Sequence, residues 1–406
     1  MPKTHRHLIA PQEYEQRIQK FRELLAEENV DAALVWGRGG GTEDRAADVR
    51  YLTGFYPVFP TIRDVAGVWS DRGLCALLVT HQELVLFTDD PAAAEASTGT
   101  TSVSVRHGVG SRSMVGDLLE QLDGRPELER IVVVAGDAMS GQHAHALLSD
   151  ARFTSREVTW NNTLVEPLRM HKSAAEIALM RHAAKIAEEA LEAGFALIAP
   201  GVNESAVVAK MAEVVARNEA VLANAFVYTA QLEGDDEDNR LPTHSSRPFS
   251  AGDLFTVDLS GTYAGYYFDL ARSIVVGAEP TPAQQRAYGL AQGAVNAVVA
   301  EMRPGAVLGE AARVGSKLLR DGGFDPEDAE FPARGHGLGL GFESPWVRDE
   351  SPEVLEPGMV ISIEQFVFID GTAATFERNV LITENGPEDL VAVQDFWTPK
   401  NGTREA

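Results

Sequence analysis

Apolar residues recur along the first third of the chain with two different spacings. Tyr14, Ile18, Phe21, Leu24 and Leu25 lie at helical spacing. Short apolar runs rich in β-branched residues are typical of buried strands, and they occur at residues 32–36, 74–80, 84–88 and 131–135. Because helices alternate with strands, we expect an α/β layer domain.

The pattern changes around residues 161–170, where we expect a second domain to begin. Ser173 followed by Glu176 is a capping-box signature, in which the serine caps a helix and the glutamate reaches back to it. Apolar residues continue at helical spacing as far as Leu191. We therefore predict an N-terminal α/β domain of residues 1–165 and a second domain of residues 166–406.

The second domain is predicted to combine helices and strands in an α+β arrangement. Helices are expected at residues 205–218, 282–302 and 308–319. Strands are expected at residues 254–260, 267–276, 360–368 and 376–383. The acidic run at residues 233–238 lies between these elements and is predicted to form a loop.

Composition and charge narrow the class of protein. The chain has 406 residues, which suits two domains. No run approaches about 18 apolar residues, and residues 1–10 lack the apolar segment of a secretory signal, so neither a membrane span nor secretion is expected. The single cysteine, Cys75, fits a reducing cytoplasm. A net charge of −25 repels nucleic acid and anionic lipid, so we expect neither as a partner.

Two aspartates occur in apolar, strand-like runs, where an unpaired carboxylate is costly. Asp258 and Asp269 are separated by a predicted turn at residues 262–265. If the turn is centred between Tyr263 and Ala264, the two aspartates are direct cross-strand partners with Cβ atoms roughly 5 Å apart.

A second hairpin repeats this arrangement with two glutamates. Glu364 and Glu377 flank Asp370-Gly371, a strong two-residue turn signal because both residues tolerate positive φ. The symmetry of that turn again makes the two acids direct partners. Like charges this close destabilise a hairpin unless they share protons, meet cations or bind metal.

His336 supplies a nitrogen ligand in the glycine-rich segment of residues 334–341. Four carboxylates and one imidazole form a mostly oxygen site, which suits Mn²⁺, Fe²⁺, Co²⁺ or Zn²⁺. Two metal ions about 3.5–4 Å apart need bridging carboxylates, and the facing pairs provide them. The residues therefore predict a metal site of Asp258, Asp269, His336, Glu364 and Glu377.

The order of these residues resembles the metallopeptidase group that includes methionine aminopeptidase, aminopeptidase P, prolidase and creatinase. The match covers about residues 165–390 and includes Leu168-Arg-Met-His-Lys-Ser-Ala-Ala-Glu176, Gly252-Asp253 and Pro357-Gly-Met359. The two-domain layout resembles aminopeptidase P, prolidase and creatinase. The resemblance implies a pita-bread catalytic fold, a creatinase-like N-terminal domain and a homodimer.

The resemblance also implies roles for the residues. Asp258 binds one metal ion, Asp269 and Glu377 bridge two, and His336 and Glu364 complete the other. We expect two divalent ions, foremost manganese, with cobalt, zinc or iron as alternatives. A bridging water, acidified toward hydroxide, attacks an amide carbonyl, and Glu364 carries the proton to the leaving amine.

The sequence departs from the family near the substrate side. Phe342 stands where prolidase-like enzymes carry a second histidine, and one residue is missing nearby. Gln365 and Phe366 follow Glu364 where Pro-Gly is common, and Thr375 replaces a frequent arginine. These absent groups help to bind the peptide carbonyl or carboxylate, so we expect an altered substrate pocket.

Two further residues are candidates for the substrate side. His244 roughly matches a catalytic or substrate-binding histidine upstream of the first ligand, although its spacing is shorter, and it could instead be a loop histidine. Glu343 either lines the pocket or is solvated.

Three functions remain open from the sequence. The first is a Xaa-Pro aminopeptidase or dipeptidase that hydrolyses short peptides. The second is a related enzyme acting on a small non-peptide substrate, like creatinase, ectoine hydrolase or a sulfonium lyase. The third is a non-catalytic pita-bread binding module. A dinucleotide-binding oxidoreductase lacks its glycine fingerprint.

Overall fold

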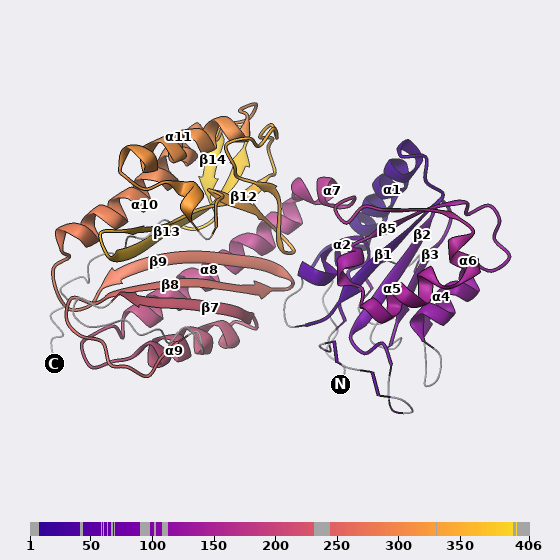
Figure 1. Ribbon diagram of the computed structural model, residues 1–406, viewed down its shortest axis with the longest axis horizontal. Coiled ribbons are helices and arrows are strands. Elements are labelled where there is room, and N and C mark those ends of the chain that lie inside the picture. The colour runs from indigo at the N-terminus through magenta and orange to yellow at the C-terminus, as the bar shows by residue number, and fades with distance from the viewer. Residues whose placement is uncertain are drawn as a thin grey trace. The chain divides into compact units, whose positions relative to one another are not determined.

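The computed structural model describes residues 8–40, 44–57, 59, 61–62, 64–65, 68, 70–89, 98–100, 103–107, 113–230, 244–329, 331–392 and 395. Its contacts divide the chain into two compact units, Met1–Arg169 and Met170–Ala406 (Figure 1). The acidic run predicted as a loop lies outside the described residues.

The first unit is built around a mixed sheet of six strands. Its helices are α1 (Pro11–Glu27), α2 (Ala47–Thr53), α4 (Met114–Leu122), α5 (Gly141–Leu148), α6 (Ala151–Thr154) and α7 (Glu166–Met170), the last of which ends at the first residue of the second unit. Its strands are β1 (Ala32–Arg38), β2 (Leu74–Thr80), β3 (Leu84–Thr88), β4 (Ser104–His107), β5 (Arg130–Val134) and β6 (Glu157–Trp160). They lie in the order β4-β3-β2-β1-β5-β6.

The central strands of this sheet are buried on both faces, which explains why their sequences are continuous apolar runs. On one face Leu34 and Leu118 belong to a core shared with α4, α5 and α6. On α1, Phe21 and Leu25 are fully buried. The four strands predicted from the sequence are all present, and the α/β prediction for this part of the chain is confirmed.

The second unit carries two antiparallel sheets. Its helices are α8 (Ala174–Phe195), α9 (Glu204–Arg217), α10 (Pro282–Glu301) and α11 (Leu308–Asp321). Its strands are β7 (Val221–Ala230), β8 (Leu254–Tyr263), β9 (Tyr266–Val275), β10 (Gly335–Leu338), β11 (Phe342–Trp346), β12 (Val360–Ile369), β13 (Thr372–Thr383) and β14 (Gly386–Asp389). The sheets have the orders β7-β8-β9 and β11-β10-β12-β13-β14.

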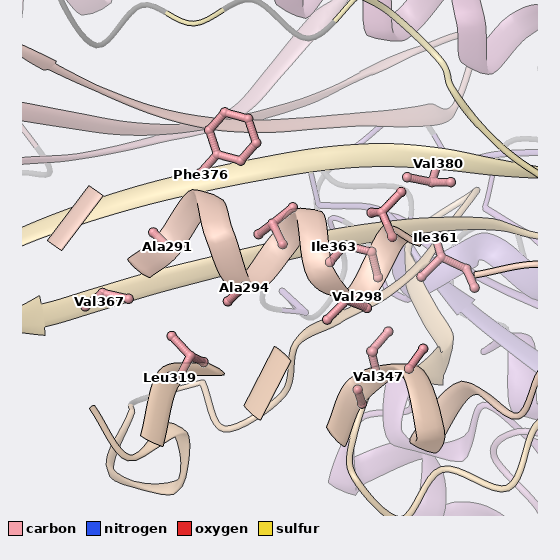
Figure 2. Packing of buried hydrophobic residues seen from close by; sticks show 14 of the residues in the cluster. Ala291, Ala294, Val298, Leu319, Val347, Ile361, Ile363, Val367, Phe376 and Val380 are labelled. Atoms are coloured by element: carbon pink, nitrogen blue, oxygen red, sulfur yellow. The ribbon is translucent and has the colours of Figure 1, made fainter. Parts of the chain in front are cut away.

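Each sheet of the second unit has one helix-covered face and one face that carries polar residues. Alternation along a strand places successive side chains on opposite faces. In β12, Ile361, Ile363 and Val367 pack with α10 and α11, as Figure 2 shows. In β8, Phe255 and Val257 pack in the core that contains α8 and α9 residues. Asp258 and Glu364 therefore lie on the faces turned away from the helices.

The predicted helices and strands of this unit are present, with ends shifted by a few residues. The capping box is also confirmed: the Glu176 backbone donates to Ser173 Oγ at 3.2 Å, and the Ser173 backbone donates to the glutamate side chain at 2.9 Å. Four strands of this unit were not predicted from the sequence: β7, β10, β11 and β14. Strands β10 and β11 lie in or beside the glycine-rich segment of residues 334–341. Its short runs are interrupted by glycines and do not show a strand pattern.

Candidate metal centre

The second hairpin has the predicted register. Glu364 pairs directly with Glu377 across β12 and β13. The turn residues Asp370 and Gly371 have φ values of 54° and 75°, which aspartate and glycine tolerate better than most residues. The two glutamates therefore share one face of the sheet, as the sequence predicted.

The register of the first hairpin differs from the prediction. The turn is centred between Ala264 and Gly265, both with positive φ, so the strands extend to Tyr263 and Tyr266. This one-residue displacement of the centre shifts the pairing by two: Asp258 faces Ala271, and Asp269 faces Ser260. The predicted direct pair is wrong, but the aspartates are diagonal neighbours on the same face because a shift of two preserves alternation.

Three carboxylates from the two hairpins meet in one place. One oxygen from each of Asp258, Asp269 and Glu377 lies within 4.8 Å of the other two. Asp258 Oδ1 and Asp269 Oδ1 are buried without a hydrogen-bond partner. Buried carboxylate oxygens without donors are costly unless a cation meets them. This donor set fits divalent metal ions.

Glu377 is held firmly in this position. Its side chain is fully buried, and its Oε2 accepts a hydrogen bond of 2.5 Å from the Ala271 backbone. Its other oxygen accepts from the Ser362 hydroxyl. The carboxylate thereby joins the two sheets through β9, β12 and β13. Ser362 was not predicted as a site residue, although it precedes Glu364 by two residues and therefore shares its face of β12.

His336 and Glu364 complete the cluster. His336 Nε2 lies 3.4 Å from Asp269 Oδ2 and 3.4 Å from Glu364 Oε1. Its Nδ1 lies 2.9 Å from the Gly337 carbonyl, which accepts when that nitrogen carries the proton. This hydrogen bond leaves Nε2 available as a ligand. The Glu364 side chain is 19% exposed, so it can reach both the cluster and a substrate.

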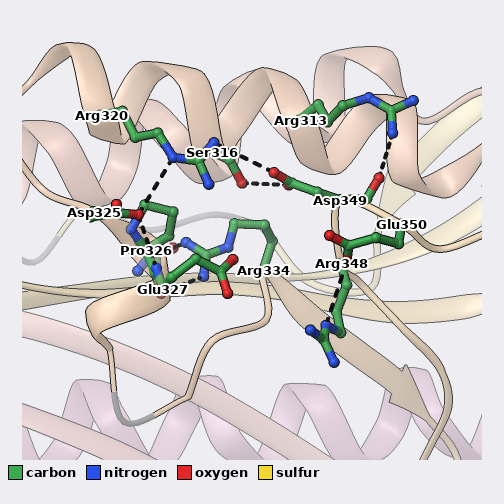
Figure 3. Close-up of polar contacts among 11 residues, drawn as sticks. Arg313, Ser316, Arg320, Asp325, Pro326, Glu327, Arg334, Arg348, Asp349 and Glu350 are labelled. Atoms are coloured by element: carbon green, nitrogen blue, oxygen red, sulfur yellow. Dashed lines mark hydrogen bonds and ion pairs between the residues drawn. The ribbon is translucent and has the colours of Figure 1, made fainter.

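The glycine-rich segment brings its backbone close to neighbouring strands. Gly335 has φ of 144°, and a Cβ there would lie 1.9 Å from the Ser362 carbonyl oxygen. Arg334 anchors the start of the segment, since its guanidinium donates to Gln365 Oε1 at 2.5 Å. It also donates to the Pro326 carbonyl at 3.5 Å (Figure 3). Glycine at residue 335 therefore permits a close approach of two backbone segments.

Without bound cations, the clustered acids bind protons more tightly than ordinary carboxyl groups do. Burial raises the pKa of Asp258 to about 6, and the charge of Glu364 adds to this rise. Burial, followed by neighbouring carboxylates, also raises the pKa of Asp269 and of Glu377 well above the usual carboxyl range. Burial alone would lower the pKa of His336, but the hydrogen bond and charge of Glu364 outweigh it, so the pKa is raised.

These shifts predict how metal stabilisation depends on pH. A carboxyl group with a raised folded-state pKa binds its proton more tightly when folded, so folding stability falls as pH rises through that pKa. A bound cation removes this penalty and competes with the protons. We expect saturating Mn²⁺ to raise Tm more at pH 7.5 than at pH 5.5. A ligand that binds only the folded protein, present at 100 times its Kd, adds about 2.7 kcal/mol to the free energy of unfolding.

Thermal unfolding with Mn²⁺ or with EDTA measures this difference. Asp370→Asn is a matched control, because it removes an exposed acid from the hairpin that carries Glu364 and Glu377. This variant should keep the full metal-induced increase in Tm. Equal metal-induced increases in Tm at pH 7.5 and pH 5.5 would contradict the predicted competition between metal ions and protons.

The residues that depart from the family lie on the strands that carry the cluster or on the neighbouring strand β11. The Phe342 ring centroid is 4.7 Å from that of His336. Thr375 is buried, and its hydroxyl donates to the Gln365 carbonyl at 3.2 Å. Gln365 is itself buried and bound to Arg334. Aromatic and neutral groups thus occupy these positions.

Glu343 is not solvated. It is 3% exposed and accepts a hydrogen bond of 2.7 Å from Lys172 Nζ, whose side chain is also buried. A Cβ at Gly339 would lie 2.3 Å from Glu343 Oε1, so glycine there makes room for the pair. The interpretation of Glu343 as a solvated group is wrong.

His244 lies apart from the contacts that define the cluster. Its Nδ1 is 3.2 Å from the hydroxyl of Ser205, in the first turn of α9, and the imidazole is half-buried. The neighbouring Ser245 backbone donates to Glu204 at 2.7 Å. Its predicted catalytic or substrate-binding role stays a prediction.

An α+β unit with acids and an imidazole gathered between two antiparallel sheets defines this protein as a metal-dependent hydrolase. Residues 178–384 match the metallopeptidase family M24, and residues 17–171 match the Creatinase/Prolidase N-terminal domain. The chain belongs to the M24 metallopeptidases, which use divalent metal ions. The pita-bread fold is thereby confirmed, and a non-catalytic binding module is set aside.

Known proteins resemble most of the chain. The peptidase YqhT of Bacillus subtilis (strain 168) is 26% identical over 377 residues, covering 91% of this chain and 96% of its own. The Xaa-Pro dipeptidase of Pyrococcus furiosus is 30% identical over 240 residues, covering 57% of this chain and 66% of its own. The prolidase structure from Pyrococcus horikoshii OT3 superposes with a TM-score of 0.76 at 22% identity, covering 94% of this chain and 99% of its own. In the part of the chain that is described, no helix has the length and apolarity to cross a membrane.

Proposed function

We propose that this protein is a dinuclear-metal peptidase of the Xaa-Pro type. The observation that carries the proposal is the cluster of Asp258, Asp269 and Glu377, with two buried oxygens that lack donors. The Pyrococcus furiosus relative named as a Xaa-Pro dipeptidase supports the substrate class. Manganese, a homodimer and a cytoplasmic location remain predictions of this proposal.

In this proposal five residues would hold two ions: Asp258, Asp269, His336, Glu364 and Glu377. Bound metal ions would polarise the amide carbonyl and acidify a water molecule. His336 presents Nε2 because its other nitrogen is engaged by Gly337.

Glu364 is proposed as the proton carrier. It is partly exposed, whereas Glu377, opposite it, is fully buried and hydrogen-bonded through both oxygens. A carboxylate that reaches solvent can accept a proton from the attacking water and deliver it to the leaving nitrogen. The new C–O bond then replaces the broken C–N bond, and the products are a carboxylate and an amine.

Turnover of matched peptides tests this function. With Mn²⁺ present, we expect hydrolysis of Xaa-Pro peptides and at least about 10-fold lower kcat/KM for the corresponding Xaa-Gly peptides, a difference of about 1.4 kcal/mol. The released N-terminal amino acid can be quantified by chromatography. Equal turnover of both series, or none, would contradict the proposal.

The second candidate is hydrolysis of a small non-peptide amide. Phe342, Gln365 and Thr375 favour it, because they stand where the family commonly carries a histidine, a proline and an arginine. Failure with every Xaa-Pro peptide but turnover of a cyclic amide or urea would select this candidate.

A further inference from the structure

Strands β9 and β13 belong to different sheets but are joined directly by hydrogen bonds. β9 is the outermost strand of its own sheet. β14 pairs with β13 at residues 380–383, beyond the part that meets β9. Hydrogen bonds join residues 269–273 of β9 to residues 375–379 of β13, and we call this contact the seam. Among the described residues, the two strands form no backbone ladder with each other.

Side chains take the place of a backbone ladder at the seam. At each level one partner supplies a side chain and the other supplies its backbone. The partners are Asp269 and Asn379, Ala271 and Glu377, and Ser273 and Thr375. Residue numbers rise by two along one strand as they fall by two along the other. The strands therefore run antiparallel at the seam, and a side chain stands between their backbones at each level.

Two of the predicted metal ligands belong to the seam. Asp269 accepts a hydrogen bond there through its backbone carbonyl, and Glu377 accepts one through Oε2. Both residues also supply a carboxylate oxygen to the cluster with Asp258. A displacement of β9 against β13 would therefore change the distance between the two carboxylates. Hydrogen bonds that fix a ligand residue in this way commonly govern metal affinity.

Arg272 holds the Glu377 side of the seam. Its guanidinium donates to the carbonyls of Ala271 and Glu377 at 2.7 and 2.6 Å. It also lies 4.3 Å from the centroid of the Phe376 ring, and its side chain is buried. The main chain of Glu377 is thereby fixed to β9 independently of its carboxylate.

Asn379 holds the Asp269 side of the seam. Both residues are 3% exposed, and Asn379 Nδ2 donates to the Asp269 carbonyl. Asn379 Oδ1 is buried without a hydrogen-bond partner among the described residues. A buried polar atom without a partner destabilises a fold, and an apolar residue of similar volume would avoid that penalty. The contribution of the amide at this position is therefore the bond that it makes to Asp269.

We propose that Asn379 is a positioning residue for the metal centre. By holding the main chain of Asp269 against β13, its amide sets the spacing between the Asp269 and Glu377 carboxylates and thereby the affinity for divalent ions. Asn379 acts through Asp269 and needs no contact with an ion or a substrate. This inference rests on the proposed function, because it concerns the same metal ligands.

Calorimetric titration with Mn²⁺ tests this role. Asn379→Leu keeps a similar volume and removes the donor. We expect the Kd for Mn²⁺ to rise at least about 10-fold, because loss of a group that orients a metal ligand typically weakens affinity about 10- to 100-fold. The urea midpoint of the metal-free variant should stay close to that of the wild-type protein, because the unpartnered Oδ1 is removed together with the donor. Asn379→Ala removes the same donor and serves if leucine prevents folding.

Ser273→Ala is the matched control within the seam. It removes the acceptor of the buried Thr375 N–H, at a level four residues from Asp269 along β9. We expect the opposite pattern from this variant: a lower urea midpoint, because a buried donor loses its partner, and an unchanged Kd for Mn²⁺.

The two variants distinguish positioning from general stabilisation. Wild-type affinity for Mn²⁺ in Asn379→Leu would overturn the inference. An equal loss of affinity in Ser273→Ala would also overturn it, because loosening of the whole seam would then explain the result.

The titration also separates this inference from the proposed function. Wild-type protein that binds Mn²⁺ but cleaves no Xaa-Pro peptide would contradict the proposed function alone, and the measured affinities would still decide the role of Asn379. Wild-type protein that binds no Mn²⁺ would overturn both.

Discussion

Replacing Glu377 with alanine is expected to lower kcat/KM by about 10³-fold or more. In the proposed site this carboxylate would help to hold the ions, and it also accepts hydrogen bonds from the Ala271 backbone and the Ser362 hydroxyl. Metal ions supply several kcal/mol of transition-state stabilisation, and each 1.36 kcal/mol changes the rate tenfold. Steady-state hydrolysis of the best Xaa-Pro peptide measures the loss.

A control substitution shows whether the loss of activity depends on where the removed acid lies. Asp370→Asn alters a carboxylate in the turn of the same hairpin and should leave kcat/KM within about twofold, since surface ion pairs contribute little. Glu377→Ala with nearly wild-type turnover would remove this residue from the proposed site.

Replacing Glu343 with leucine is expected to lower the free energy of unfolding by about 3–5 kcal/mol. The substitution leaves the Lys172 ammonium buried without its carboxylate, and removing one partner of a buried ion pair costs about that much. Urea unfolding monitored by circular dichroism measures the change.

A double substitution separates the charge effect from packing. Lys172→Met with Glu343→Leu should recover most of the stability, because apolar residues of similar volume often replace a buried ion pair without loss. A single Glu343→Leu variant as stable as the wild-type protein would show that the ammonium finds another partner.

The sequence predicted the hairpins because local rules determine them. Alternating apolar positions indicated β8, β9, β12 and β13, and the Asp370-Gly371 turn is short enough to define one register. The longer run at residues 262–265 is compatible with two turn centres. The structure has the turn centred between Ala264 and Gly265, which both have positive φ. A shift of two residues kept Asp269 on the correct face.

Contacts between distant segments could not be predicted from local patterns. The Ala271 backbone meets Glu377, and Lys172 meets Glu343, across more than one hundred residues of chain in each case. The strand β10 was missed because glycines dominate its sequence.

Metal content, measured by elemental analysis, shows whether these residues form a metal centre. We expect about two transition-metal ions per chain in wild-type protein loaded with Mn²⁺ and then dialysed, as is typical of a paired-metal site. We expect marked loss of metal in Asp269→Ala and in Glu377→Ala, but not in Asp370→Asn. No retained metal in the wild-type protein, or the same content in all four proteins, would contradict a metal centre formed by these residues.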